Sequence, residues 1–161
     1  MNPALTNGLT ARHAGDIKRY HVWPTIQQQS VAHHTWNVLR IYIELFGPPS
    51  PEITTCIVYH DVGELATGDI PFDAKRANPK LKKIVGEIDD EAAKLLSAGW
   101  YDSDDLSEKE QDMVKFCDLL EMMEFAIEEI RLGDVFYGAY DEIKDRKGKL
   151  VNGVFIKEVA E

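Results

Sequence analysis

The chain has 161 residues and a formal net charge of −10, with 44% hydrophobic and 29% charged residues. This length suffices for one domain with a substantial core and is short for two, so we expect a single domain over residues 1–161. The acidic balance argues against a nucleic-acid polymer as a partner, because a phosphate backbone binds to a basic surface. A local cluster of Lys and Arg can still bind a small anion.

Both cysteines, Cys56 and Cys117, lie inside apolar runs. This pattern is typical of reduced, buried thiols and not of a disulfide framework. Residues 1–20 contain charges and no apolar core of signal-peptide length, and no apolar run is long enough to span a membrane. We therefore expect a cytoplasmic protein (in the host cytoplasm, if a phage encodes it) with no membrane partner.

The first 29 residues predict little regular structure. Residues 1–8 contain Pro3 and Gly8 and are expected to form a loose lead-in. Residues 9–20 have only weak helical spacing. Residues 21–29, with Trp23-Pro24 followed by three glutamines, are expected to form an ordered loop.

Ser30 is a suitable N-cap for a helix that runs to about Phe46. Its apolar residues recur at helical spacing: Val31, Val38, Ile41 and Leu45. His34 falls on this stripe, whereas His33 falls on the polar face. The periodicity therefore predicts that His34 points inward and that His33 lies at the surface or rim.

Ser50-Pro51 predicts the start of the next helix, expected over residues 51–66, because Ser favours the N-cap and Pro the first turn. Its inward face is expected to include Ile53, Cys56, Ile57 and His60. Helical offsets would also bring His60, Asp61 and Glu64 toward one side. Thr67-Gly68 ends this helix, and residues 69–72 are expected to form a turn or loop.

Two longer helices and a tail follow. Residues 79 to about 99 predict a helix with this buried side: Leu81, Ile84, Val85, Ile88, Ala92, Leu95 and Leu96. The capping box of Ser107 and Glu110 begins a helix that Gly133 ends, with Asp118 among its apolar positions. Residues 135–145 predict a short helix, and residues 147–161 a short strand or extended tail. The whole pattern predicts an all-α bundle with five or six main helices.

Three helices thus each present an inward polar group, namely His34, the His60-Asp61 pair and Asp118. Taken singly, an inward His is usually a satisfied core residue, and an Asp on an apolar face is usually paired in a salt bridge. Together they supply two imidazoles and two carboxylates. This donor set suits a divalent transition metal that retains room for water.

The order of four motifs resembles the HD-domain phosphohydrolases and, within them, the small 5′-deoxynucleotidase branch. The motifs are Arg19-Tyr20, the segment Val31-Ala32-His33-His34, the run from His60-Asp61 through Glu64 to Thr67-Gly68-Asp69-Ile70-Pro71, and Asp118. The chain is also similar to the short phage dATP triphosphohydrolases that deplete dATP where 2-aminoadenine replaces adenine in the genome. The resemblance covers residues 19–133 and implies a helical HD fold.

The resemblance also implies roles for individual residues. The ligands of one Zn, Co or Mn ion would be His34, His60, Asp61 and Asp118. Glu64 would orient or deprotonate the attacking water, with Asp69 as its partner near the leaving oxygen. Arg19 would clamp a phosphate, Tyr20 would pack on the sugar, and Val22 would wall the base. A homo-oligomer, either a dimer or a hexamer, is also implied.

Two departures from the family pattern affect these roles. His33 stands where Glu is usual before the ligand His, so it could compete for the metal. Tyr20 stands where Trp is common, which weakens any inference of deoxyribose selectivity.

A cluster of basic residues near the loop is the best candidate for holding a longer polyphosphate tail: Lys75, Arg76, Lys80, Lys82 and Lys83. The alternative is that Lys82 and Lys83 form an ordinary solvated helix face.

The favoured function is metal-dependent cleavage of the 5′ phosphate ester of deoxynucleotides, chiefly of dATP to deoxyadenosine and triphosphate. One alternative is a 5′-deoxynucleotidase acting on deoxynucleoside monophosphates. Another is a catalytically silent nucleotide-binding module. Cleavage of a guanosine tetraphosphate alarmone or a cyclic dinucleotide is disfavoured by the short chain and the Thr-Gly-Asp-Ile-Pro segment.

Overall fold

The computed structural model describes residues 10–133, whose regular elements are all helices and confirm the predicted all-α class. The elements are α1 (Ala11–Ala14), α2 (Val31–Phe46), α3 (Pro51–Tyr59), α4 (Glu64–Thr67), α5 (Phe72–Ala77), α6 (Pro79–Leu96), the 3₁₀ turn η2 (Ser103–Asp105) and α7 (Glu108–Leu132). The expectations for residues 1–8, 135–145 and 147–161 lie outside the described residues. Within residues 10–133, no helix combines the length and apolar character needed to cross a bilayer.

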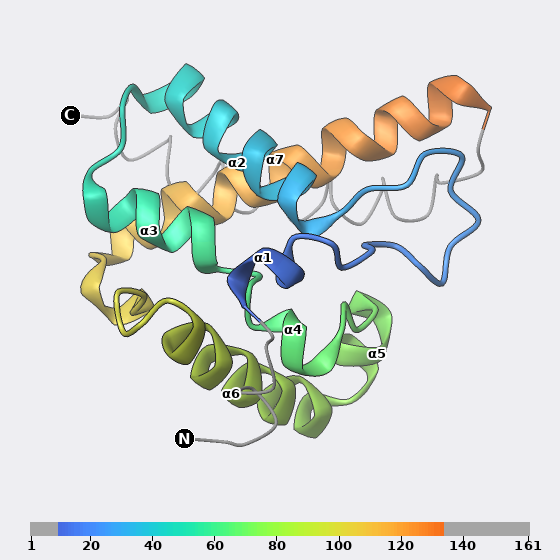
Figure 1. Cartoon of the computed structure of the whole chain (residues 1–161). Coiled ribbons are helices and arrows are strands. Elements are labelled where there is room, and N and C mark those ends of the chain that lie inside the picture. The colour runs from blue at the N-terminus through green and yellow to red at the C-terminus, as the bar shows by residue number, and fades with distance from the viewer. Residues whose placement is uncertain (1–9, 134–161) are drawn as a thin grey trace.

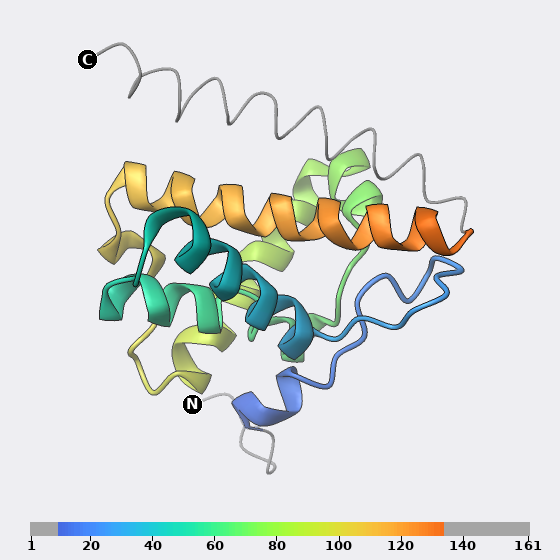
Figure 2. The same ribbon diagram turned by 90° about the horizontal axis from the view of Figure 1, so that it is seen from above.

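The helices form two groups joined by the segment between α3 and α4 (Figure 1). Helix α2 packs against α7 and α3, while α6 packs against α4 and α5. Helices α2 and α7 cross each other at an angle where they pack together (Figure 1 and Figure 2). The small helix α1 contacts α4, so the N-terminal part of the described chain lies beside the junction of the two groups. This junction is where the polar motif residues 60–64 are found.

The predicted helix starts are confirmed by their capping bonds. Ser30 Oγ accepts from the N–H of His33 at 3.3 Å, and Ser50 Oγ accepts from the N–H of Ile53 at 3.2 Å. At α7 the Ser107 N–H donates to Glu110 Oε2 at 2.8 Å, which completes the capping box. Such caps satisfy backbone donors that a helix start leaves without partners.

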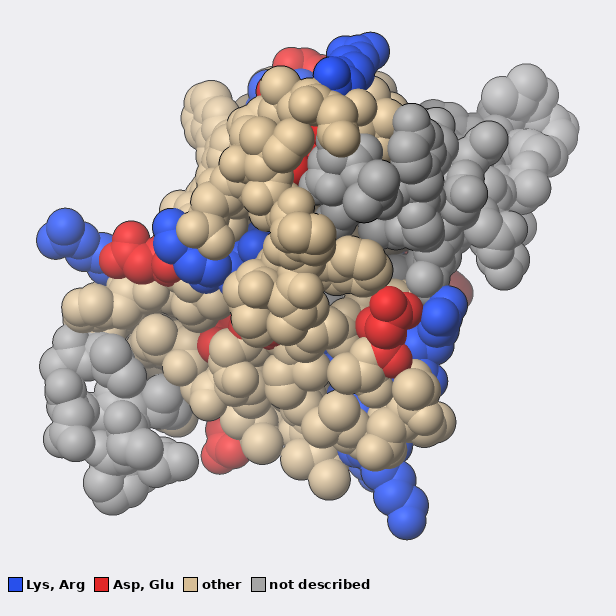
Figure 3. All heavy atoms as spheres, turned by 90° about the vertical axis from the view of Figure 1, so that its right-hand side faces the viewer, with Lys and Arg blue, Asp and Glu red and all other residues tan. Residues whose placement is uncertain are grey.

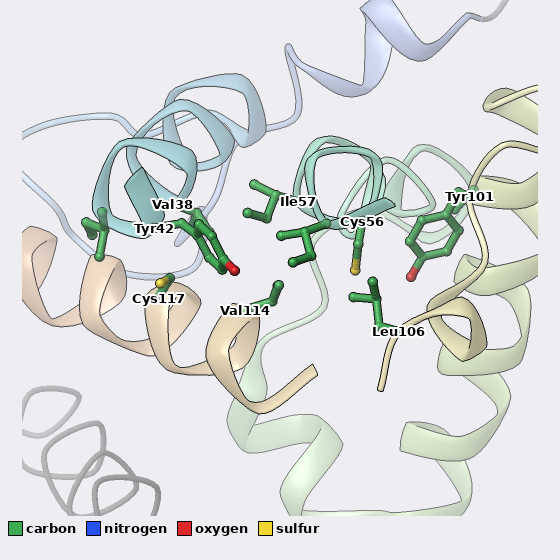
Figure 4. Packing of buried hydrophobic residues seen from close by; sticks show 11 residues of the cluster. Val38, Tyr42, Cys56, Ile57, Tyr101, Leu106, Val114 and Cys117 are labelled. Atoms are coloured by element: carbon green, nitrogen blue, oxygen red, sulfur yellow. The ribbon is translucent and has the colours of Figure 1, made fainter. Parts of the chain in front are cut away.

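One hydrophobic cluster holds α2, α3 and α7 together (Figure 4). Its fully buried members include Val38 from α2, Ile57 from α3 and Cys117 from α7. The segment between α6 and α7 adds Tyr101 and Leu106. Removing each large apolar side chain from water contributes about 1.5–3 kcal/mol. Both cysteines are buried and free, as expected.

The prediction of one helix over residues 51–66 is wrong. Helix α3 ends at Tyr59, and the next residues form tighter i→i−3 turns, in which the Val62 N–H donates to the Tyr59 carbonyl at 3.1 Å. Gly63, in this segment, packs closely on α6. A Cβ there would lie 2.0 Å from the carbonyl oxygen of Asp89 on α6. The lack of a side chain at Gly63 thus lets this segment approach α6 more closely than any other residue would permit.

The predicted buried sides of two helices are partly wrong. On α2, Leu45 is 48% exposed. On α6, Ile84, Ile88 and Leu95 are exposed, and the helix instead packs through Val85, Ala92 and Ala93. Two of these three contacts are small alanines, which allow backbones to approach closely, so the buried side is rotated away from the more hydrophobic stripe.

Two segments differ in extent from the expectation. Among the described residues 10–20, only Ala11–Ala14 is helical, and residues 18–30 form a loop closed by an antiparallel bridge between Lys18 and Ser30. The expected turn at residues 69–72 ends one residue early, because Phe72 begins α5 directly after Pro71.

Candidate active site

Three of the predicted metal ligands meet at the junction of the two helix groups. One donor atom from each of His34, His60 and Asp61 lies within 4.8 Å of the others. His34 Nε2 is 3.3 Å from His60 Nε2 and 3.6 Å from Asp61 Oδ2, and His60 Nε2 is 3.4 Å from the same oxygen. The side chain of His34 is fully buried, while His60 and Asp61 are partly exposed at its outer side.

Asp118 brings the fourth predicted donor from α7. Its Oδ1 lies 3.2 Å from His34 Nε2, the same ring nitrogen that faces His60 and Asp61. The structure therefore groups His34, His60 and Asp61 around one point and places Asp118 against His34, and two imidazoles with two carboxylates are a donor set that fits a single divalent transition metal. His33 is exposed on the polar face of α2, as predicted, and its side chain is not part of this cluster.

The two imidazoles have different supports for their inner nitrogens. The Nδ1 of His60 lies 2.7 Å from the carbonyl oxygen of Ile57, which accepts its N–H. The Nδ1 of His34 bonds to Glu121. In each ring Nδ1 is thus engaged, which leaves Nε2 as the nitrogen turned toward the cluster.

The charges of the cluster keep both carboxylates ionised, the form that binds metal. Burial raises the pKa of Asp61, but His60 and Arg19 outweigh it and bring the pKa to about 2. Burial likewise opposes ionisation of Asp118, yet Lys115 and His34 hold its pKa well below the usual range. Opposite charges nearby favour the ionised carboxylate.

His34 responds in the opposite direction. Burial and Arg19 lower its pKa, but hydrogen bonds with Asp118 and Glu121 raise it to about 9. In this arrangement the ring holds a second proton between two carboxylates. Metal binding at Nε2 requires the loss of that proton, since only neutral imidazole is a ligand.

Two cations flank the donor set. The guanidinium of Arg19 is buried and donates to Asp61 Oδ2, and the half-exposed Lys115 pairs with Asp118 Oδ2. Arg19 was predicted for this site from the sequence, and Lys115 was not. The spacing of Lys115 from Asp118 could have indicated their pairing, because residues three positions apart lie on the same side of a helix.

Glu64 and Asp69 lie next to this cluster. Glu64 is 7% exposed, and its Oε2 has no hydrogen-bond partner among the described residues. Burial, followed by the negative charge of Asp61, raises its pKa to about 8. Asp69 adds to this rise and accepts the backbone N–H of Tyr20 at 2.9 Å. A buried carboxyl with a displaced pKa beside a donor set is typical of an acid–base catalyst.

Tyr20 and Val22, the residues predicted to contact sugar and base, are placed differently from each other. The Tyr20 ring stacks on Phe125 of α7, with centroids 4.9 Å apart. Val22 is 58% exposed on the loop of residues 18–30 and is not brought into the cluster. Among the described atoms, the middle of the face in Figure 3 is largely uncharged. Two further apolar residues of the loop, Trp23 and Ile26, are exposed.

Of the predicted basic cluster, Lys75 acts electrostatically on the site. Its charge lowers the pKa of Glu64, although burial and Asp61 dominate. Arg76 is mostly exposed and lies 3.2 Å from Asp73 on α5. The remaining lysines lie on the exposed surface of α6: Lys80, Lys82 and Lys83.

Behind the cluster, α7 presents two further buried carboxylates that the sequence analysis missed. Glu121 bonds His34 and Gln29, and Glu129 accepts the backbone N–H groups of Ile26 and Gln27 at 2.6 and 2.9 Å. They attach the loop of residues 18–30 to α7. A Glu three residues after the buried Asp118 was the available signal for Glu121.

Comparison with known proteins identifies the family of this chain. The family model described as 5′-deoxynucleotidase YfbR-like matches residues 11–160. The chain is 31% identical over 124 residues to 5′-deoxynucleotidase PM0747 of Pasteurella multocida, covering 65% of this chain and 64% of that protein. It is 25% identical over 173 residues to the dATP triphosphohydrolase of cyanophage S-2L, covering 99% of this chain and 91% of that relative.

Two solved structures share the fold. The HD phosphohydrolase of cyanophage S-2L, bound to dA and one catalytic Zn2+ ion, has a TM-score of 0.65 at 23% identity, with 86% of this chain and 80% of that chain covered. A conserved hypothetical protein from Pyrococcus furiosus has a TM-score of 0.60 at 22% identity, with 93% and 95% covered. Because the family match extends over most of the sequence, the chain belongs to the YfbR-like 5′-deoxynucleotidase family.

Proposed function

We propose that this protein is a metal-dependent phosphohydrolase that cleaves the 5′ phosphate ester of deoxynucleotides, with dATP, giving deoxyadenosine and triphosphate, as the favoured substrate. The observation that carries the proposal is the convergence of His34, His60 and Asp61 on one point, with Asp118 in contact with His34 beside them. The buried Glu64 beside them supplies a group that can manage a proton.

The metal ligands in this proposal are those four residues, and zinc is the first candidate, with cobalt and manganese as alternatives. The related phage phosphohydrolase was solved with a catalytic Zn2+ ion, which supports zinc. A bound divalent ion lowers the pKa of water and neutralises phosphoryl charge. The chain supplies the matching donors, because both carboxylates are held ionised.

In the reaction, a water oxygen forms a bond to the 5′ phosphorus while the bond between phosphorus and O5′ breaks. Ionised Glu64 orients that water and takes up one of its protons. The same proton then passes from Glu64 to the leaving O5′, which restores the carboxylate and balances the charges. Asp69 acts as the partner of Glu64 near the leaving oxygen. The negative charge of Asp69 already contributes to the raised pKa of Glu64. Proton transfer by a positioned carboxyl contributes about 10²–10⁴-fold to such reactions.

Arg19 and Lys115 are the proposed phosphate contacts next to the ligands, because both cations already border the donor set. Guanidinium binds phosphate oxygens through two parallel hydrogen bonds, which suits Arg19. Lys75 and Arg76 would hold the distal phosphates of a triphosphate. Arg76 would first have to exchange its contact with Asp73.

The contacts to sugar and base form a separate part of the proposal. Tyr20 would contact the sugar from its position against Phe125, and Val22 would reach the base from the exposed loop.

Two classes of substrate are candidates, dATP and the deoxynucleoside monophosphates. Similarity along 99% of the chain to a dATP triphosphohydrolase supports dATP. The family match and the 31% identity to a 5′-deoxynucleotidase, of which this chain spans 64% of the length, support deoxynucleoside monophosphates as the second candidate.

The test is product analysis over all deoxynucleoside mono-, di- and triphosphates, each with Zn²⁺, Co²⁺ or Mn²⁺. Intact triphosphate and deoxyadenosine from dATP would support the first substrate, and activity confined to monophosphates would support the second. Unchanged nucleotides under every condition would contradict the enzyme and favour a silent nucleotide-binding module. That the protein forms a homo-oligomer, either a dimer or a hexamer, stays a prediction. Light scattering on the purified protein tests it.

A further inference from the structure

Glu121 is a buried carboxylate that connects three segments behind the proposed metal site. It lies on α7 and is 2% exposed. One oxygen, Oε2, bonds His34 Nδ1, while Oε1 accepts the side-chain amide of Gln29 at 2.8 Å. The amide of Asn37 on α2 lies 3.4 Å from the same Oε1. Oε2 therefore has a partner on α2, and Oε1 has partners on both the loop of residues 18–30 and α2.

The bond to His34 has a consequence for the opposite side of the ring. A carboxylate is only an acceptor, so it fixes a proton on Nδ1. The neutral ring then has its lone pair on Nε2, which faces His60, Asp61 and Asp118. Without an acceptor at Nδ1, the neutral ring could protonate Nε2 instead and could rotate about its side-chain bonds.

We propose that Glu121 is a positioning residue for the metal site, which fixes the tautomer and the orientation of His34 so that Nε2 is presented to the ion. The inference rests on the proposed metal-dependent function. It adds that Gln29, 1% exposed, in turn holds Glu121 in place. The proposed metal site is thereby attached to the loop that carries Arg19 and Tyr20.

A purely structural role would account for burial but not for this geometry. To attach the loop to α7, a neutral acceptor at position 121 would be enough to bind the Gln29 amide. Such a side chain would also avoid the cost of burying a charge. A carboxylate is the group that also makes a ligating imidazole more basic and holds its orientation. Loss of such an outer partner lowers metal affinity by about 10–100-fold.

The test compares Glu121→Gln with Glu124→Gln in the full chain. Both substitutions remove one negative charge from α7, but Glu124 lies at the surface and pairs with Arg40. Zinc is removed with a chelator, and the Zn²⁺ dissociation constant is measured by competition with a chromophoric chelator. Circular dichroism and thermal melting of the metal-free proteins report folding. We expect Glu121→Gln to bind Zn²⁺ about 10–100-fold more weakly and Glu124→Gln to bind like the wild type.

A second variant, Gln29→Met, guards against misfolding of the first. It removes the amide that holds Oε1 and leaves the carboxylate on His34, so a smaller loss of affinity is expected. The absorption spectrum of the Co²⁺-loaded protein should change with Glu121→Gln, because it reports the coordination geometry. Unaltered affinity in both variants, or equal losses in Glu121→Gln and Glu124→Gln, would overturn the positioning role alone. A wild-type protein that binds no Zn²⁺ would instead overturn the metal site and the proposed function.

Discussion

Nε2 of His34 lies 3.2 Å from Oδ1 of Asp118, and this contact joins α2 to α7 at the centre of the candidate site. Neither residue belongs to the adjacent His60-Asp61 pair, the motif for which the HD-domain phosphohydrolases are named. The two long helices therefore do more than pack an apolar core, since their contact places the fourth predicted ligand, Asp118, against His34.

Replacing Asp118 with Ala is expected to abolish metal binding and activity together. The change removes one of two ionised donors and leaves Lys115 without its partner. Because outer partners alone contribute about 10–100-fold to metal affinity, a direct ligand should contribute more than about 100-fold. Zinc content by elemental analysis and nucleotide turnover measure the two effects. Glu124→Gln is the control, and full zinc occupancy in Asp118→Ala would remove Asp118 from the ligand set.

Replacing Glu64 with Gln should separate turnover from metal binding. Glu64 is not one of the four proposed ligands, so the zinc content should be retained. The amide cannot take up a proton, so turnover should fall by about 10²–10⁴-fold. Steady-state kinetics on zinc-loaded protein measures this loss. Normal turnover would exclude Glu64 from the chemistry.

The raised pKa of Glu64 predicts how stability depends on pH in the metal-free protein. Burial and Asp61 raise this pKa from 4.5 to about 8, so between these values the folded state binds more protons than the unfolded state. The stabilisation is fully present below about pH 4.5 and is lost as the pH rises toward 8.

Thermal melting from pH 4.5 to pH 8 checks this effect, with Glu64→Gln as the matched variant. His34, whose pKa is also raised, contributes in the same direction in both proteins. The difference between the two curves therefore isolates Glu64. Parallel curves would show that the carboxyl titrates normally.

Gly63→Ala should destabilise the fold by about 1–3 kcal/mol or more, the usual effect of overpacking. The added Cβ would lie 2.0 Å from the Asp89 carbonyl oxygen, so the backbone of α6 or of the segment before α4 must move. Gly86→Ala on α6 is the control. A Cβ at Gly86 meets nothing within 4 Å, and Ala favours a helix by about 1 kcal/mol over Gly. Urea unfolding of both variants should give shifts of opposite sign.

The sequence by itself determined the all-α class, the starts of α2, α3 and α7, and the inward direction of His34. These features depend on short-range physics: a capping side chain reaches residues within one turn, and a helical stripe is set by spacing along the chain. For the same reason, His33 could be assigned to the surface from periodicity alone.

The tertiary structure decided what no local pattern encodes. The close approach of Gly63 to Asp89 joins segments far apart in the chain, and the buried side of α6 depends on which neighbour its alanines meet. Glu121 reaches His34 and Gln29 only when α7 packs against α2 and the loop of residues 18–30, whereas the pair of Lys115 and Asp118 forms within α7 itself. Burial, charge pairing and ring orientation are properties of what lies opposite a residue, and folding alone brings those groups together.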